Sequence, residues 1–245
     1  MTDMTASPTF APTVELNPHP RTPDELGVIL ANPGFGNFFT DHMFLAKWTP
    51  DEGGADPRIG PYGHLNLDPA TAVLHYAQEV FEGLKAYAHD DGSIWLFRPE
   101  ANAERMQRSA HRLALPELPT DWFIGSIKAL IDADAAWIPH GDEKSLYIRP
   151  FMFASERFLG VRPSQHVTYS VIASPAGAYF AGGVKSVSIW LSTEYSSAGV
   201  RGTGAAKCVC KSASSLLPQV SPARPARRPR RAPGRGRSPA RSRRP

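Results

Sequence analysis

The chain has 245 residues, of which 42% are hydrophobic and 20% charged, so it is long enough to bury one sizeable core or two modest ones. Its first residues lack the basic start and apolar run of a secretory signal, and no stretch approaches the roughly 18 apolar residues that cross a bilayer, which predicts a cytoplasmic protein without membrane contact. The two cysteines, Cys208 and Cys210, supply neither a disulfide framework nor the four ligands of a structural zinc site, so we expect no metal.

The formal net charge of +4 averages two unlike segments. The last 28 residues, 218–245, hold ten arginines and no acid, whereas the 217 residues before them carry 17 basic and 23 acidic side chains. Because a proline-rich segment without aromatic residues cannot build a core, we predict a disordered basic tail over 218–245. A shifted reading frame in GC-rich coding DNA tends to yield such a composition of Pro, Arg, Ala and Gly, and it is our preferred explanation of the tail. Nucleic-acid or anionic-surface binding by this tail alone is the alternative.

The first half of the chain predicts an arm, a strand, a helix and a further strand. Residues 1–24 are rich in Pro and Thr and have no period, which indicates an extended N-terminal arm that is ordered only by docking. Residues 28–48 contain strand-like stretches broken by Pro33 and Gly34, with the first sheet strand at 42–48. In 69–87, apolar residues recur mostly at three- and four-residue steps, which predicts a helix that gives way near Gly83. Residues 93–97 predict a strand.

Two amphipathic helices and three strands are expected next. Pro99 begins the first helix, and Pro116 and Pro119 stop it. Thr120 and Asp121 are a predicted N-cap pair for the second helix, whose apolar stripe continues to Trp137. Runs rich in β-branched and aromatic residues then predict strands at 145–153, 166–174 and 185–192. The fold class is therefore α/β or α+β.

Six segments carry a family resemblance: FFTDHM, LHYAQEVFEGLKAY, FRPEANAERMQRSAHRL, LYIRPFMF, SPAGAYF and GTGAAK. In this order they resemble the fold-type IV pyridoxal-phosphate enzymes, and within them the branched-chain amino acid aminotransferases. The resemblance covers about residues 27–217, a little over half of a family chain, which implies a truncated or frame-shifted C-terminus. It implies amino-group exchange between leucine, isoleucine or valine and 2-oxoglutarate, with pyridoxal 5'-phosphate as cofactor. Amino acids and 2-oxo acids would be the small-molecule partners, in a homodimer.

The resemblance also implies a domain division. Residues 25–180 would form the small α/β domain. Residues 181–217 would form the interdomain segment and the start of an incomplete, barrel-like, cofactor-binding large domain.

The chemistry requires an amine that can lose its proton and fixed donors for a phosphate. By resemblance Lys207 in GTGAAK carries the cofactor and moves the proton, and Arg105 grips the phosphate. For the substrate, the resemblance implies that Arg149 binds the side-chain carboxylate of glutamate or 2-oxoglutarate. The implied pocket aromatics are Phe39, Tyr76, Phe81, Tyr147 and Tyr179.

The resemblance fails after the lysine. Where the family has Gly-Gly-Asn-Tyr, this chain has Val209, Cys210, Lys211 and Ser212, and its last acidic residue is Glu194. A carboxylate partner for the cofactor's ring nitrogen, which the family supplies after the lysine, is therefore missing. We expect very weak or no transaminase activity.

Two alternatives to a branched-chain transaminase stay open at this point. One is another fold-type IV enzyme, such as a D-amino acid aminotransferase or an aminodeoxychorismate lyase. The other is a non-catalytic remnant that keeps the small domain and perhaps its dimer surface. A covalent cofactor adduct at Lys207 would exclude the remnant.

Overall fold

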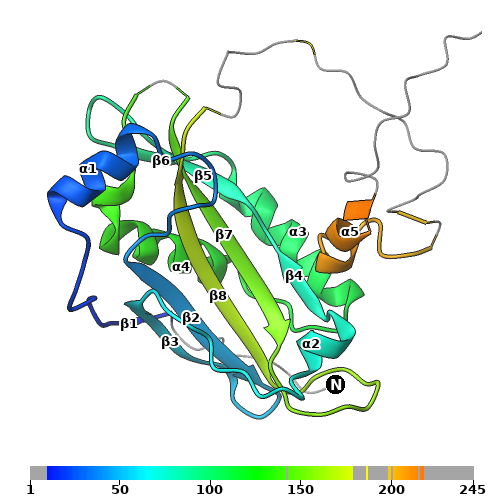
Figure 1. Ribbon diagram of the computed structural model, residues 1–245. Helices are drawn as coiled ribbons and strands as arrows, with labels where there is room; N and C mark the ends of the chain where they lie inside the picture. Colours follow the sequence, from blue (N-terminus) through cyan, green and yellow to red (C-terminus); the bar gives the residue numbers. More distant parts are fainter. Residues whose placement is uncertain are drawn as a thin grey trace, which may run out of the picture.

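The computed structural model describes residues 10–141, 143–178, 186, 198–199, 201–214 and 216–217. Within these residues the centre of the fold is an eight-stranded sheet in the order β1-β3-β2-β8-β7-β5-β6, with β4 pairing with β7 off this path (Figure 1). Neighbours are antiparallel except for β1 and β3. The strands are β1 (Thr13–Val14), β2 (His42–Thr49), β3 (Gly53–Pro61), β4 (Glu79–Phe81), β5 (Leu84–Ala88), β6 (Ile94–Leu96), β7 (Ser145–Ala154) and β8 (Val167–Ala176).

Helices cover one face of this sheet. The described helices are α1 (Pro23–Ala31), α2 (Ala72–Tyr76), α3 (Pro99–Arg112), α4 (Thr120–Ala133), a 3-10 turn at Ala135–Trp137, and α5 (Val209–Ala213). Helices α3 and α4 lie behind the sheet, and α5 lies beside β4 (Figure 1). The observed α/β body confirms the predicted fold class. Among the described helices, none is both long and apolar enough to cross a membrane.

The two faces of β7 differ because successive side chains of a strand point to opposite sides. Ile148 and Met152 belong to the core that the sheet forms with α3 and α4, together with Phe44, Ile127 and Leu130. The odd-numbered residues of β7 therefore point to the other face, which we call the open face. They are only partly buried at Tyr147, Arg149 and Phe151.

Two of the expectations for the first half were wrong. Residues 28–31, expected to be strand-like, belong to helix α1, where Thr22 and Glu25 form a capping box that outweighs the local strand propensity. The expected helix at 69–87 is limited to α2, which is followed by its C-cap residue Ala77 in the left-handed region with φ 49°. Residues 79–81 and 84–88 instead pair with β7, so tertiary pairing overrides a helical period.

The later helices agree better with the sequence. Pro99 lies in the first turn of α3, as predicted. The predicted N-cap pair at Thr120 is wrong by one residue: Pro119 is the N-cap, without a side-chain hydrogen bond, and Thr120 is the first helical residue. The helix ends at Ala133, and a 3-10 turn continues to Trp137. Strands β7 and β8 confirm the predictions at 145–153 and 166–174.

The described part of the N-terminal arm docks on the sheet and on α4. Thr13 and Val14 pair with β3, and the Phe10 ring contacts Phe44 and Trp122 at centroid distances of 6.0 and 5.5 Å. Tyr179, the predicted strand at 185–192 apart from Ser186, and the predicted tail at 218–245 lie outside the described residues.

Candidate active site

The peptide of Lys207 is tied to both β4 and α3. Its carbonyl accepts a hydrogen bond from Phe81 N at 3.1 Å, and its N–H donates to the Ser109 hydroxyl oxygen at 2.9 Å. An antiparallel bridge between Val80 and Cys208 continues this pairing. The lysine therefore lies at the edge where α5 meets β4, although it is more than 120 residues away from β4 in sequence.

The amine of Lys207 lies over an aromatic ring and among charges. Its Nζ is 4.5 Å from the centroid of the Phe81 ring. Partial burial lowers the pKa of Lys207, while the negative charge of Glu82 raises that pKa, and Arg105, Arg149 and Lys211 lower it further. The net direction is downward, so this amine is neutral in a larger fraction of molecules than a surface lysine.

Arg105 forms a two-point ion pair with Glu82. Its Nε donates to Glu82 Oε1 at 2.7 Å, and its Nη2 donates to Glu82 Oε2 at 2.6 Å. The Glu82 side chain is fully buried, whereas 46% of the Arg105 side chain is exposed. These hydrogen bonds hold the pKa of Arg105 above its usual value. The guanidinium is thus fixed on one edge and open to solvent on the other.

Arg149 and Tyr147 form a second cationic group on the open face. The Tyr147 hydroxyl accepts hydrogen bonds from Arg149 Nε at 3.3 Å and Nη2 at 2.9 Å. The Arg149 guanidinium carbon also lies 4.7 Å from the centroid of the Phe81 ring. Phe81 therefore contacts Lys207 and Arg149 at once, and both cations gain from the negative face of the ring.

Gly83 makes room for this arrangement. A Cβ built on Gly83 would overlap the Tyr147 hydroxyl and lie 3.1 Å from the ring carbon that bears it. Since any larger residue would displace the ring, the glycine of the FEGL segment is required by close approach.

The other predicted pocket aromatics have different neighbours. Phe39 stacks on Tyr62 with ring centroids 5.1 Å apart. Tyr76 donates its hydroxyl hydrogen to the Leu159 carbonyl and stacks on Phe158 at 6.2 Å. The described contacts therefore bring together Phe81, Tyr147, Arg149 and Lys207 but not Phe39 or Tyr76, and Tyr179 lies outside the described residues.

The sequence reasoning missed Glu82, Asn102 and Ser109. Asn102 Nδ2 donates to Glu82 Oε2 at 2.8 Å, and Ser109 links the Lys207 peptide to the Arg105 carbonyl. A lone acid inside the apolar run at 80–84 was the available signal for Glu82. Which cation would pair with it could not be read from the sequence.

The short helix after the lysine differs from the family pattern but is anchored. Lys211, which stands where the family has Asn, donates from Nζ to the Gly204 carbonyl at 2.6 Å. This bond closes the GTGAAK loop onto the first turn of α5.

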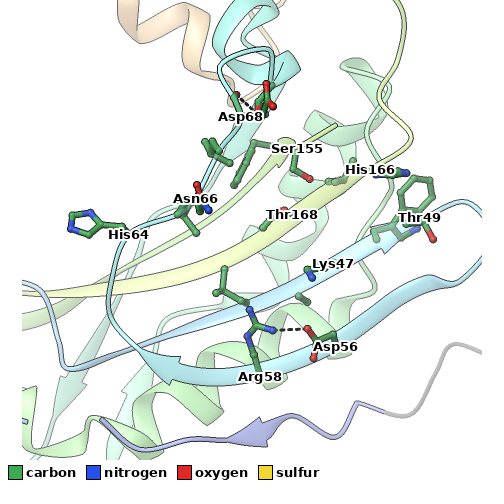
Figure 2. Close-up of a pocket in the computed structure, with 18 residues that line it drawn as sticks. Lys47, Thr49, Asp56, Arg58, His64, Asn66, Asp68, Ser155, His166 and Thr168 are labelled. Atoms are coloured by element: carbon green, nitrogen blue, oxygen red, sulfur yellow. Dashed lines mark hydrogen bonds and ion pairs between the residues drawn. The ribbon is translucent and has the colours of Figure 1, made fainter. Parts of the chain in front are cut away.

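A cavity of about 650 Å³ lies elsewhere on the molecule, between β2, β3, residues 64–68 and the adjoining ends of β7 and β8 (Figure 2). None of the predicted site residues that the structure describes lines this cavity. Much of its charge is already paired, since Arg58 Nη1 donates to Asp56 at 2.6 Å (Figure 2). We therefore place the candidate site at Lys207, where the positive charges of Arg105, Arg149 and Lys211 act on the amine.

Comparison with known proteins gives consistent names. The chain is 56% identical over 215 residues to a probable branched-chain-amino-acid aminotransferase of Streptomyces coelicolor, covering 86% of this chain and 59% of that protein. It is 56% identical over 212 residues to the enzyme of Mycolicibacterium smegmatis and 53% identical over 206 residues to that of Mycobacterium tuberculosis, covering 58% and 56% of those proteins. No family model matches the chain.

Among solved structures, a branched-chain amino acid aminotransferase of Escherichia coli aligns with a TM-score of 0.49 at 23% identity, covering 70% of this chain and 54% of that one. The chain spans less than two thirds of the length of the curated relatives named above. Over that part of their length, the chain is similar in sequence to the branched-chain-amino-acid aminotransferases.

Proposed function

We propose that this chain carries one part of a pyridoxal-phosphate-dependent branched-chain aminotransferase site. The reaction is the exchange of an amino group between leucine, isoleucine or valine and 2-oxoglutarate. One observation carries the proposal beyond the relatives' names: the Lys207 amine lies on the Phe81 ring, where the charges of Arg105 and Arg149 both act on it. An amine of lowered pKa next to separate anion-binding groups is what this reaction needs.

The described residues fit two ends of the cofactor. Pyridoxal phosphate, when bound, supplies an aldehyde and an electron-withdrawing ring. Lys207 offers the amine for the aldehyde, and the exposed edge of Arg105 offers N–H donors for the phosphate. Glu82 is the described carboxylate whose charge acts on Lys207, and it is already occupied by Arg105. A ring-nitrogen partner is therefore not assigned to any described residue.

The substrate end is assigned to the open face of β7 and β4. Arg149, held by Tyr147, would bind the side-chain carboxylate of glutamate or 2-oxoglutarate. The Phe81 ring would form part of the apolar wall for the branched side chain, with Phe39, Tyr76 and Tyr179 as further proposed lining residues. One site would thus accept both partners in turn.

We further propose the domain division and the assembly that the family resemblance implies. Residues 25–180 would be the small domain, and 181–217 would lead into the cofactor-binding domain, in a homodimer. The anchoring of Lys207 on β4 and α3 supports a site that lies between the two parts.

Covalent trapping tests the proposal directly. The purified chain is incubated with pyridoxal phosphate, reduced with borohydride and mapped by mass spectrometry. We expect the adduct at Lys207, with its loss in Lys207→Ala and its retention in Lys211→Ala. An adduct spread over surface lysines would contradict the proposal and favour a non-catalytic remnant.

An amino-donor scan then tests the substrate class. We expect leucine, isoleucine and valine to be used in preference to D-alanine, at a slow rate, because Val209 to Ser212 replace the Gly-Gly-Asn-Tyr of the family. Preference for D-alanine, or lyase activity on aminodeoxychorismate, would assign the site to a different fold-type IV enzyme.

A further inference from the structure

Glu82 is the most completely buried acid next to the candidate site. Its side chain has no exposed surface, and it lies between β4 and β5, beside Gly83. A buried carboxylate is stable only when its oxygens are hydrogen-bonded and its charge is paired. The hydrogen-bond donors to Glu82 therefore indicate what this buried carboxylate does in the structure.

Four donors converge on Glu82. Oε1 accepts from Arg105 Nε at 2.7 Å, and Oε2 accepts from Arg105 Nη2 at 2.6 Å and from Asn102 Nδ2 at 2.8 Å. The N–H of Gly83 adds a longer bond to Oε2 at 3.3 Å. Asn102 and Arg105 come from the same face of α3, since they are three residues apart. The carboxylate thus fixes the first half of α3 against the β4–β5 corner.

This pairing leaves one edge of the Arg105 guanidinium available. The group has five N–H donors in a plane, and Glu82 uses one on Nε and one on Nη2. The structure describes no hydrogen bond from the remaining three, and 46% of the side chain is exposed. A guanidinium held in this way can present a planar donor pair to an anion without losing rotamer freedom at that moment.

We propose that Glu82 is a positioning residue for a phosphate monoester: it fixes the Arg105 guanidinium so that its outer edge faces the ligand's phosphate. The proposal rests on the proposed function for the identity of that phosphate. The ion pair cancels the charge of Arg105, but Lys207 and Arg149 keep the net charge of the site positive. Glu82 thus contributes orientation, and the neighbouring cations contribute attraction.

Paired ligands separate positioning from simple structural support. Pyridoxine 5'-phosphate and pyridoxine differ only in the phosphate, and neither has an aldehyde, so their binding does not depend on the Lys207 amine. The ratio of their affinities, measured by calorimetry, is the phosphate preference. A variant that merely loosens the fold weakens both ligands together and leaves this ratio unchanged.

The variants are Glu82→Gln, the double variant Glu82→Gln/Arg105→Gln, and Glu104→Gln as the control. Glu104 is exposed and lies on the same helix, next to Arg105, so its substitution removes an equal charge without touching the pair. The double variant replaces the ion pair with two neutral amides, which protects it against the cost of a lone buried charge. Unfolding midpoints of all proteins confirm that they are folded.

We expect the phosphate preference to fall about tenfold in Glu82→Gln, to fall little further in the double variant, and to stay within about twofold in Glu104→Gln. A wild-type chain without phosphate preference would overturn the proposal. So would a Glu82→Gln protein that keeps the preference while the double variant loses it. If the preference behaves as expected but no adduct forms at Lys207, the proposed function fails and the positioning role stands.

Discussion

The Tyr147 hydroxyl accepts two hydrogen bonds from the Arg149 guanidinium, at 3.3 and 2.9 Å, although the two residues are only two positions apart on β7. Alternate residues of a strand share a face, so both side chains extend over the open face. The Tyr147 hydroxyl lies against the backbone at Gly83, and the Arg149 guanidinium lies over the Phe81 ring. An arginine fixed in this way can bind a carboxylate with little loss of its own freedom.

Replacing Gly83 with alanine should therefore disturb the pair. The new Cβ overlaps the Tyr147 hydroxyl, and overpacking of this kind costs about 1 to 3 kcal/mol of unfolding free energy. Urea unfolding of Gly83→Ala measures the cost. The control is Gly60→Ala on β3, where a Cβ meets open space and should cost almost nothing.

The cause can be tested in a Tyr147→Phe background. Without the hydroxyl, the worst overlap is removed, and a contact of 3.1 Å with the ring carbon remains. We expect the cost of Gly83→Ala to shrink there without vanishing. An equal cost in both backgrounds would mean that Tyr147 does not determine the need for glycine.

Substitution of a second glycine, Gly125, should change stability in opposite directions with and without the Phe10 ring. Gly125 lies inside α4, where alanine is normally better than glycine by about 1 kcal/mol. A Cβ at this position would lie 2.6 Å from a ring carbon of Phe10, so it displaces the N-terminal arm. We expect Gly125→Ala to destabilise the wild-type chain and to stabilise Phe10→Ala, as measured by thermal unfolding. Stabilisation in both backgrounds would show that the Phe10 ring does not lie against Gly125.

The sequence allowed the fold class and the later elements to be predicted, because prolines and periodicity are local features. Pro99 marks the start of α3, and the β-rich runs mark β7 and β8. The run at 69–87 failed because its apolar spacing suits a helix, whereas the partner that decides its structure is β7, more than 60 residues away. Strand β3 was missed because its glycines and prolines oppose strand propensity.

The candidate site, too, could be predicted from the sequence only in part. The family motifs identify Lys207, Arg105 and Arg149 as single positions. That Glu82 pairs with Arg105, and that Phe81 lies between two cations, depends on how α3, β4 and α5 pack. These contacts are tertiary, and no spacing within the chain encodes them.

Outside the site, the buried pair of His42 and Asp134 should stabilise the fold where the N-terminal arm docks. His42 Nε2 accepts from the Asn17 N–H at 2.8 Å, so its Nδ1 carries the hydrogen that Asp134 accepts at 2.7 Å. Burial raises the pKa of Asp134, and the hydrogen bonds from His42 offset part of that effect. Asp134→Ala leaves two buried donors of His42 without this acceptor and should cost about 2 to 4 kcal/mol by urea unfolding. Asp132 is exposed in the last turn of α4, next to this C-cap position, so Asp132→Ala should be nearly neutral. An equal cost at both positions would refute the assignment.

The pH dependence of Lys207 gives the sharpest test of the electrostatics around the site. Its pKa lies below the ordinary lysine value because burial disfavours the charged form, while the Glu82 carboxylate acts in the opposite direction. The folded chain therefore releases this proton at a lower pH than the unfolded chain, and the stability that the residue contributes rises with pH across that window. Attachment of pyridoxal, which lacks the phosphate, requires the neutral amine, so its rate at Lys207 should rise with pH around a midpoint below the ordinary lysine pKa. Glu82→Gln removes the carboxylate that raises this pKa and leaves the positive charge of Arg105, which lowers it, so the midpoint should move further down. The rates are measured by borohydride trapping and peptide mapping, with Glu104→Gln as the unshifted control. A midpoint that rises in Glu82→Gln would show that Glu82 does not act on this amine through its charge.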